Sequence, residues 1–163
     1  MAISSSLLSA GGPYLALPCA ELMQWQGAEN AAECQRLQHA GDGASVTAVG
    51  DKVPALVLGT PDMLYWWSTK LGGVLVRVVS FDAADDAVLA SHLERLPKKG
   101  WESVDGTLEV KGPWCVFDSA APGAKAATSA INLELAEGRY NISEQTWQPD
   151  DETELMLVRL TRG

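Results

Sequence analysis

The sequence predicts an α+β fold, mostly antiparallel β-sheet, with one clear helix at about residues 83–96. Short apolar runs separated by turn residues predominate, a pattern typical of antiparallel sheets. The strongest run, residues 74–79, is β-branched and nearly all apolar, which favours a central strand. The length of 163 residues fits one domain. Residues 1–12 are rich in Ser and Gly and predict a loose N-terminal tail, and residues 13–163 predict a single β-rich domain.

Strands are predicted wherever a short run is apolar or alternates between apolar and polar residues. These runs span residues 14–17, 44–49, 55–59, 63–69, 74–79, 113–117, 131–135, 139–142 and 155–160. Residues 101–110 form another candidate strand region, and Asp105-Gly106 at its centre indicates a hairpin turn. Gly72-Gly73 precedes a strand, so it favours a turn or bulge over a phosphate-binding loop.

The predicted helix has recognisable ends as well as periodicity. Asp82 can cap its N-terminus, with Asp85 as an acidic partner three residues later, and Pro97 ends it. Apolar residues recur on one face at Ala84, Val88, Leu89, Leu93 and Leu96. A weaker pattern in residues 31–38 favours one or two helical turns.

The charge balance limits the classes of partner. The net charge is −9 and the sequence pI is about 4.6. Nucleic-acid phosphates and anionic lipid surfaces both require clustered Lys and Arg, so we expect no nucleic acid and no membrane as a partner. An acidic surface suits a basic protein partner, although acidity also provides solubility alone.

The cysteines and the N-terminus favour a cytoplasmic location. Cys19, Cys34 and Cys115 are odd in number and lack metal-ligand spacing, as expected of free thiols in a reducing compartment. Residues 1–12 have no basic region of the kind found in signal peptides, and no apolar run reaches transmembrane length. Neither a metal nor a cofactor is expected.

No catalytic motif is evident, so we do not expect an enzyme. The chain contains only His39 and His92, and it has no nucleophile elbow, P-loop, zinc-protease or dinucleotide-binding pattern. Asp118 follows an apolar strand and is interpreted as a turn cap, although it can also point into a cleft. A small enzyme using Asp118, Cys34 or a histidine stays as an alternative.

Tryptophans and carboxylates are the candidates for binding. Trp66 and Trp67 are adjacent, so in a strand they face opposite sides and one of them is a candidate for exposure. Trp147 lies beside a dense acidic group, and exposed Trp beside charge is frequent in binding hot spots. A filled core and a solvated loop are the simpler readings of the same residues. Exposed Trp is equally compatible with a small-molecule or sugar-binding module.

A series of short motifs occurs in a set order along the chain. They include Gly11-Gly12-Pro13-Tyr14, Trp25-Gln26-Gly27, Gly72-Gly73-Val74, Gly112-Pro113, Phe117-Asp118-Ser119-Ala120, Gly138-Arg139-Tyr140 and Leu157-Val158-Arg159-Leu160. In order and composition the chain resembles the immunity protein 21 family of bacterial polymorphic-toxin systems, from about residue 11 to residue 160. It departs from the family pattern at residues 32–34, which lack a tyrosine, and at Arg77-Val78, where the family has Arg-Trp.

The resemblance implies a mostly β, cytoplasmic antidote that binds a cognate toxin domain and blocks it. An acidic inhibitor suits a basic toxin cleft, such as that of a nuclease or deaminase. A tight antidote also needs a few desolvated aromatic anchors inside a polar rim. On this basis the expected partner-binding residues are Trp66, Trp67, Trp147, Asp150, Asp151, Glu152 and Glu154.

Overall fold

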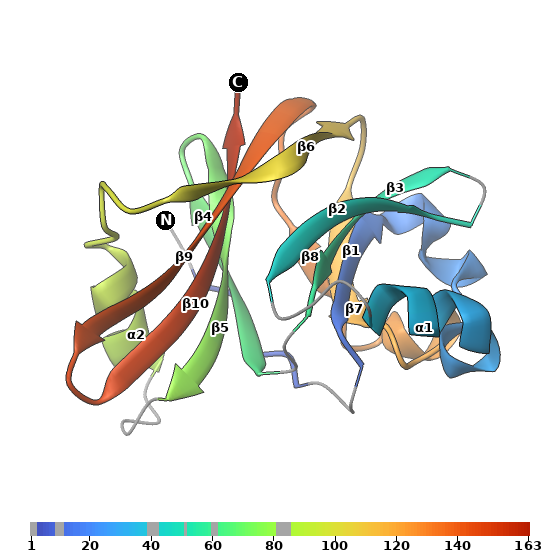
Figure 1. Cartoon of the computed structure of the whole chain (residues 1–163), viewed down its shortest axis with the longest axis horizontal. Helices are drawn as coiled ribbons and strands as arrows, with labels where there is room; N and C mark the ends of the chain where they lie inside the picture. The colour runs from blue at the N-terminus through green and yellow to red at the C-terminus, as the bar shows by residue number, and fades with distance from the viewer. Residues whose placement is uncertain (1–2, 9–11, 39–42, 51, 60–61, 81–85) are drawn as a thin grey trace.

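Two antiparallel β-sheets pack face to face, and helices cover their outer faces (Figure 1). The computed structural model describes residues 3–8, 12–38, 43–50, 52–59, 62–80 and 86–163. Antiparallel strands dominate over short helices, which confirms the α+β prediction.

The first sheet, here called the β1 sheet, has strand β1 at its centre. Its five strands are ordered β2-β3-β1-β7-β8 and span Ala44–Val49, Val53–Leu58, Tyr14–Pro18, Trp114–Asp118 and Ile131–Leu133. Because β1 pairs with a neighbour on each side, the short run between two prolines is almost wholly buried. The outer face is covered by η1, η2, α1 and α3, which span Cys19–Gln24, Gly27–Glu29, Ala31–Gln38 and Gly123–Ala126.

The second sheet, here called the β10 sheet, has β10 at its centre. Its five strands are ordered β4-β5-β10-β9-β6 and span Met63–Thr69, Gly72–Ser80, Thr153–Arg162, Gly138–Asp150 and Glu102–Val110. Helix α2, Asp86–Leu93, lies against its outer face and buries Leu89 and Leu93 there. The β5 and β10 residues beneath α2 are therefore covered on both faces, whereas much of β6 and β9 stays exposed on the outer face.

Alternation along the strands divides the apolar residues between these layers. In β1, Tyr14 faces the other sheet, whereas Leu15 faces the helices. In β4, Trp66 faces the other sheet, whereas Trp67 faces α2. Side chains that fill adjacent layers thus come from consecutive residues, which is why the central strands are apolar at nearly every position.

The structure corrects the hairpin expected at Asp105-Gly106. Strand β6 runs through both residues, and its pairing with β9 passes from Val104↔Ile142 to Thr107↔Asn141. The two residues are therefore a β-bulge in one long strand, and Gly106 takes the left-handed φ of 96° that such a bulge requires. An Asp-Gly dipeptide turns a hairpin only if the flanking halves pair with each other, and here both pair with β9.

The helical predictions are met in part. Helix α2 occupies Asp86–Leu93, inside the expected range of 83–96, and Glu94 and Arg95 continue it only as a turn. The proposed caps at Asp82 and Asp85 lie outside the described residues. Helix α1, of 8 residues, lies over residues 31–38, where one or two helical turns were expected.

Residues 3–8 lie within the segment that the sequence predicts as a loose tail, and they run along the edge of β4. The Ser4 amide donates to the Trp66 carbonyl at 2.9 Å, and the Leu7 amide donates to the Leu64 carbonyl at 2.8 Å. Leu7 is only 4% exposed and joins the core between the sheets. This contact covers backbone groups of an edge strand that would otherwise be open to pairing.

The glycine pair that opens β5 makes room for a core tryptophan. A Cβ atom added at Gly73 would lie 2.3 Å from the Trp66 ring, which is itself 2% exposed. Position 73 therefore needs glycine for close packing between strands and not for a turn.

We predict that Gly73→Ala lowers the free energy of unfolding by about 1–3 kcal/mol, because the buried ring has no free space into which it can shift. Urea denaturation measures the change. Gly112→Ala is the matched control, since a Cβ atom there meets nothing within 4 Å. Equal stability of the two variants would contradict this account of the packing.

Candidate functional site

The end of the β9–β10 hairpin brings together the predicted acidic residues and one predicted tryptophan. Asp150, Asp151 and Glu152 are exposed at the turn, whereas Glu154 and Trp147 are half-buried on the two strands. The strand register pairs Asp150 with Thr153 and Trp147 with Leu155. We call these five residues, Trp147, Asp150, Asp151, Glu152 and Glu154, the acidic hairpin end.

Trp66 and Trp67 do not belong to this surface, and their expected exposure is wrong. They face opposite sides of β4 as alternation requires, but they are only 2% and 3% exposed. One ring is covered by the β1 sheet and the other by α2. Neither is available to a partner in this structure.

The acidic turn is held by its own hydrogen bonds and by a histidine of α2. The Glu152 amide donates to Asp150 Oδ1 at 2.9 Å, and His92 Nε2 lies 3.1 Å from Asp150 Oδ2. The Glu152 amide and the Thr153 hydroxyl favour the carboxylate, as His92 does when it is protonated, so the pKa of Asp150 is lowered. The turn is thereby fixed against the C-terminal part of α2.

Trp147 links the acidic hairpin end to this helix. Its ring packs at the edge of the apolar cluster that α2 forms with the β10 sheet. It also lines a shallow cavity of about 260 Å³ together with His92, Arg95 and Pro149. One side of the ring is thus fixed in the core and the other faces solvent, as is common for tryptophans at interfaces.

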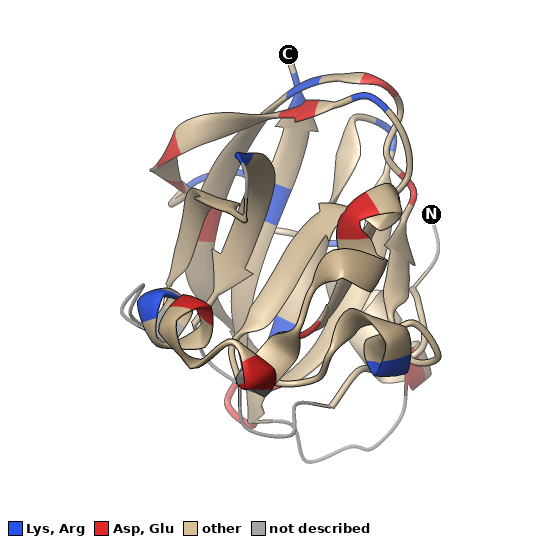
Figure 2. Cartoon of the chain, turned by 90° about the vertical axis from the view of Figure 1, so that its right-hand side faces the viewer, with Lys and Arg blue, Asp and Glu red and all other residues tan. Residues whose placement is uncertain are grey.

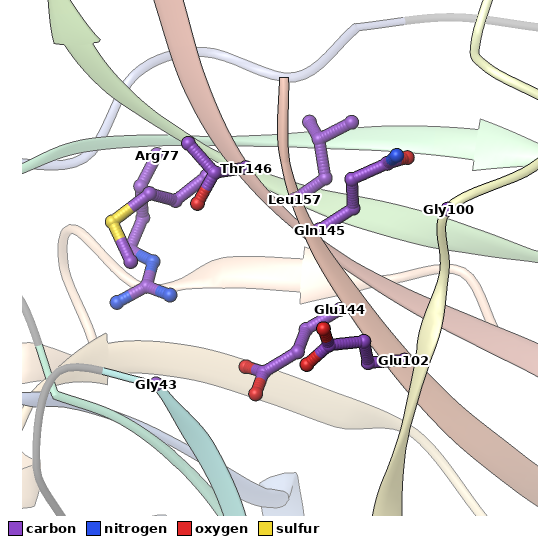
Figure 3. A pocket seen from close by; sticks show the side chains of 9 residues that line it. Gly43, Arg77, Gly100, Glu102, Glu144, Gln145, Thr146 and Leu157 are labelled. Atoms are coloured by element: carbon purple, nitrogen blue, oxygen red, sulfur yellow. The ribbon is translucent and has the colours of Figure 1, made fainter.

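A polar pocket of about 350 Å³ lies on the inner face of the same hairpin, between the two sheets (Figure 3). Arg77 is 1% exposed and lines it, and Glu102 and Glu144 lie directly opposite each other on β6 and β9. Glu144 accepts the Ala44 amide at 2.9 Å, so it joins the two sheets. No sequence motif indicates this pocket, although the single arginine in the apolar run 74–79 is a signal for it.

Of the residues named for an enzyme, those within the described ranges do not form a nucleophile–base arrangement. The Cys34 thiol donates to the Gly27 carbonyl at 2.9 Å, and burial, Glu33 and Asp118 raise its pKa. A nucleophilic cysteine needs the opposite shift. Asp118 accepts the Ala120 amide at 3.0 Å, as expected of a turn cap, and His92 lies on the other sheet. His39 lies outside the described residues.

The described residues include neither a candidate metal site nor a candidate membrane span. Among the described residues, no three His, Cys, Asp or Glu side chains are grouped so that they could hold a metal ion. No helix in those ranges combines the length and the apolar character needed to cross a membrane.

Comparison with known families decides the classification. The family model for immunity protein 21 matches residues 6–153. These residues include every strand of both sheets except β10, of which only the first residue, Thr153, is matched. The chain belongs to the immunity protein 21 family. Neither the curated proteins nor the solved structures contain a significant match to it.

In this immunity protein, charges of both signs are interspersed over the face that carries α1 and the β1 sheet (Figure 2). The acidic hairpin end, with its exposed neighbouring carboxylates, lies on the other sheet.

We predict that Thr153→Val raises the pKa of Asp150, because the variant loses the hydroxyl that favours the carboxylate. Since the pKa is depressed in the folded state, ionised Asp150 contributes stability above its unfolded-state pKa and loses it as the pH falls through the folded value. Carboxyl-carbon NMR titration measures the shift. Thr146→Val, on the pocket side of β9, is the control and should leave the pKa of Asp150 unchanged. The prediction fails if Thr153→Val also leaves the pKa of Asp150 unchanged.

Proposed function

We propose that this chain is a cytoplasmic immunity protein that binds a cognate bacterial toxin domain and neutralises it by direct contact. The observation that carries the proposal is the match of the family model over residues 6–153. The three free cysteines, Cys19, Cys34 and Cys115, are in keeping with a reducing cytoplasm. Only a protein-protein role is proposed, with no cofactor, nucleic acid or membrane as a partner.

The charge of the chain favours a basic toxin domain. A net charge of −9 raises the rate of association with a positive surface and disfavours other acidic proteins. Toxins that act on nucleic acids, such as nucleases and deaminases, have basic clefts, and an acidic protein can occupy such a cleft as a nucleic-acid mimic. Glu102 and Glu144 support the same partner, because carboxylates paired across two strands repel each other and a cation between them relieves that repulsion.

The acidic hairpin end is the proposed contact surface. It offers Asp151 and Glu152 as exposed charges and Trp147 as a half-buried ring held against α2. Interface hot spots combine an aromatic anchor with a polar rim in this way. Its backbone is fixed by the β9–β10 pairing and by the turn hydrogen bonds, so little conformational entropy is lost on binding.

We predict that the chain rescues a heterologous bacterium from the toxin encoded by the neighbouring gene. Co-expression should restore growth, and a pull-down should recover a stable complex of fixed stoichiometry. Toxicity that persists without any complex would refute the proposed function for that toxin. An uninduced toxin gene provides the growth control.

We also predict that the double variant Asp151→Lys, Glu152→Lys slows association with that toxin domain by about tenfold or more at low salt. The difference should shrink at high salt, because exposed charges are screened. Surface plasmon resonance measures both rates. The double variant Glu134→Lys, Glu137→Lys is the matched control, since both residues are exposed and lie just before β9, near its other end. If the control slows association as much as the first double variant, only the net charge matters and the acidic hairpin end is not the contact surface.

A further inference from the structure

The outer face of the β10 sheet is only partly covered by α2. Leu155 and Leu157 of β10 are buried beneath the helix, together with Leu89 and Leu93. Alternation places Arg159 and Thr161 on this same face farther along β10, and both are only half-buried. The end of the sheet beyond α2 is therefore open.

A groove of about 560 Å³ follows this open end. Its floor is formed by β9 and β10, with Asn141, Ser143, Arg159 and Thr161. The turn between β4 and β5, residues 69–71, forms one side, and Ser103 at the start of β6 lies on the other.

Arg159 is fixed at the centre of this region by two contacts. Its Nε donates to Ser143 Oγ at 3.2 Å, and its guanidinium carbon lies 4.2 Å from the centroid of the Trp101 ring. Trp101 is fixed in turn, since its Nε1 donates to the Pro97 carbonyl at 2.8 Å. The cation is thus oriented before any partner arrives, which reduces the entropy lost on binding.

The charge of the groove is opposite to that of the chain. Its lining contains Lys70 and Arg159 and no acidic residue. Within the described ranges, no carboxylate forms an ion pair with Arg159. Partial burial lowers the pKa of Arg159, so the guanidinium has lost hydration that an opposite charge can replace. A carboxylate is the complementary group, because it accepts two parallel hydrogen bonds from a guanidinium.

Resting on the proposed function, we propose that the toxin domain docks an acidic segment in this groove, with a carboxylate on Arg159 and a second acidic or polar group near Lys70. Exposed Leu71, at 60%, and the Trp101–Arg159 stack provide the apolar and aromatic parts of the contact. A second copy of this chain is a poorer occupant. Two copies related by a two-fold axis could each place the acidic hairpin end in the other's groove, but the free chain would then be a dimer, which light scattering detects.

The groove and the acidic hairpin end lie near opposite ends of β10. The strand runs over 10 residues from Thr153 to Arg162, a length of about 30 Å. A standard protein interface, with about 800 Å² buried on each partner, is wide enough to reach both. Substitutions at the two ends are far enough apart that their effects on binding should add.

The test uses the full chain and the toxin domain encoded by the neighbouring gene. Isothermal titration compares the wild-type chain with Arg159→Gln, Lys70→Glu and the matched control Lys125→Glu, an exposed lysine of α3 on the other sheet. Arg159→Gln should raise Kd about tenfold to a hundredfold and Lys70→Glu about tenfold, whereas Lys125→Glu should not raise it. Lys70 is exposed in the β4–β5 turn, so its variant keeps the test valid even if Arg159→Gln proves poorly folded by circular dichroism.

Three outcomes overturn the proposal. Wild-type binding that neither Arg159→Gln nor Lys70→Glu weakens would leave the proposed function intact and remove the groove from it. No binding by the wild-type chain would refute the proposed function, and this proposal with it. The third outcome comes from light scattering of the free chain. If the wild-type chain is a dimer or larger oligomer and Lys70→Glu is a monomer, a second copy occupies the groove.

Discussion

The structure depends on one apolar layer that two sheets share. Tyr14, Trp66 and Trp114 lie in this layer, and all are at most 2% exposed. Because helices also cover part of each outer face, a charge in the covered part of a central strand would be poorly solvated on either side. Charged residues are consequently confined to strand ends, turns and the open parts of the sheets. The surfaces available for binding follow from this restriction, since they are the places that the layers do not cover.

Arg77 is the exception to this restriction, and its position has a physical consequence. It comes from the middle of an apolar strand and is 1% exposed, at the end of the sandwich where the sheets diverge around the polar pocket. A buried guanidinium is tolerated only where polar groups replace its hydration. In the same region Glu144 of one sheet accepts the Ala44 amide of the other. Polar contacts thus join the sheets at the end where apolar packing stops.

The local structure was predictable from the sequence because it depends on near neighbours in the chain. Alternation and turn residues gave the strands of both sheets, and the helix over residues 86–93 followed from its apolar face. What failed depended on distant residues. Alternation correctly put Trp66 and Trp67 on opposite faces, but whether a face is open is decided by α2 and by the β1 sheet. Asp105-Gly106 likewise became a bulge because β9 pairs with both halves of β6.

The candidate site was predictable to a similar extent. The acidic hairpin end is contiguous in sequence, so composition alone indicated it. The groove beside Trp101 combines residues from β4, β6, β9 and β10, and no spacing rule links them. The positive charge of the groove was not predictable from composition either, because a cationic groove is not expected in a chain with a net charge of −9.

A surface that carries both signs of charge has an advantage for an antidote that must distinguish its toxin from others. Uniform acidity would attract any basic protein, since the long-range field does not depend on shape. A fixed guanidinium about 20 Å along β10 from the acidic turn adds a requirement for a carboxylate at one place on the partner. A toxin that is basic throughout would bring a cation against Arg159, and like charges brought together in an interface cost several kcal/mol. Attraction at the acidic hairpin end and rejection at the groove together give a specificity that neither surface has alone.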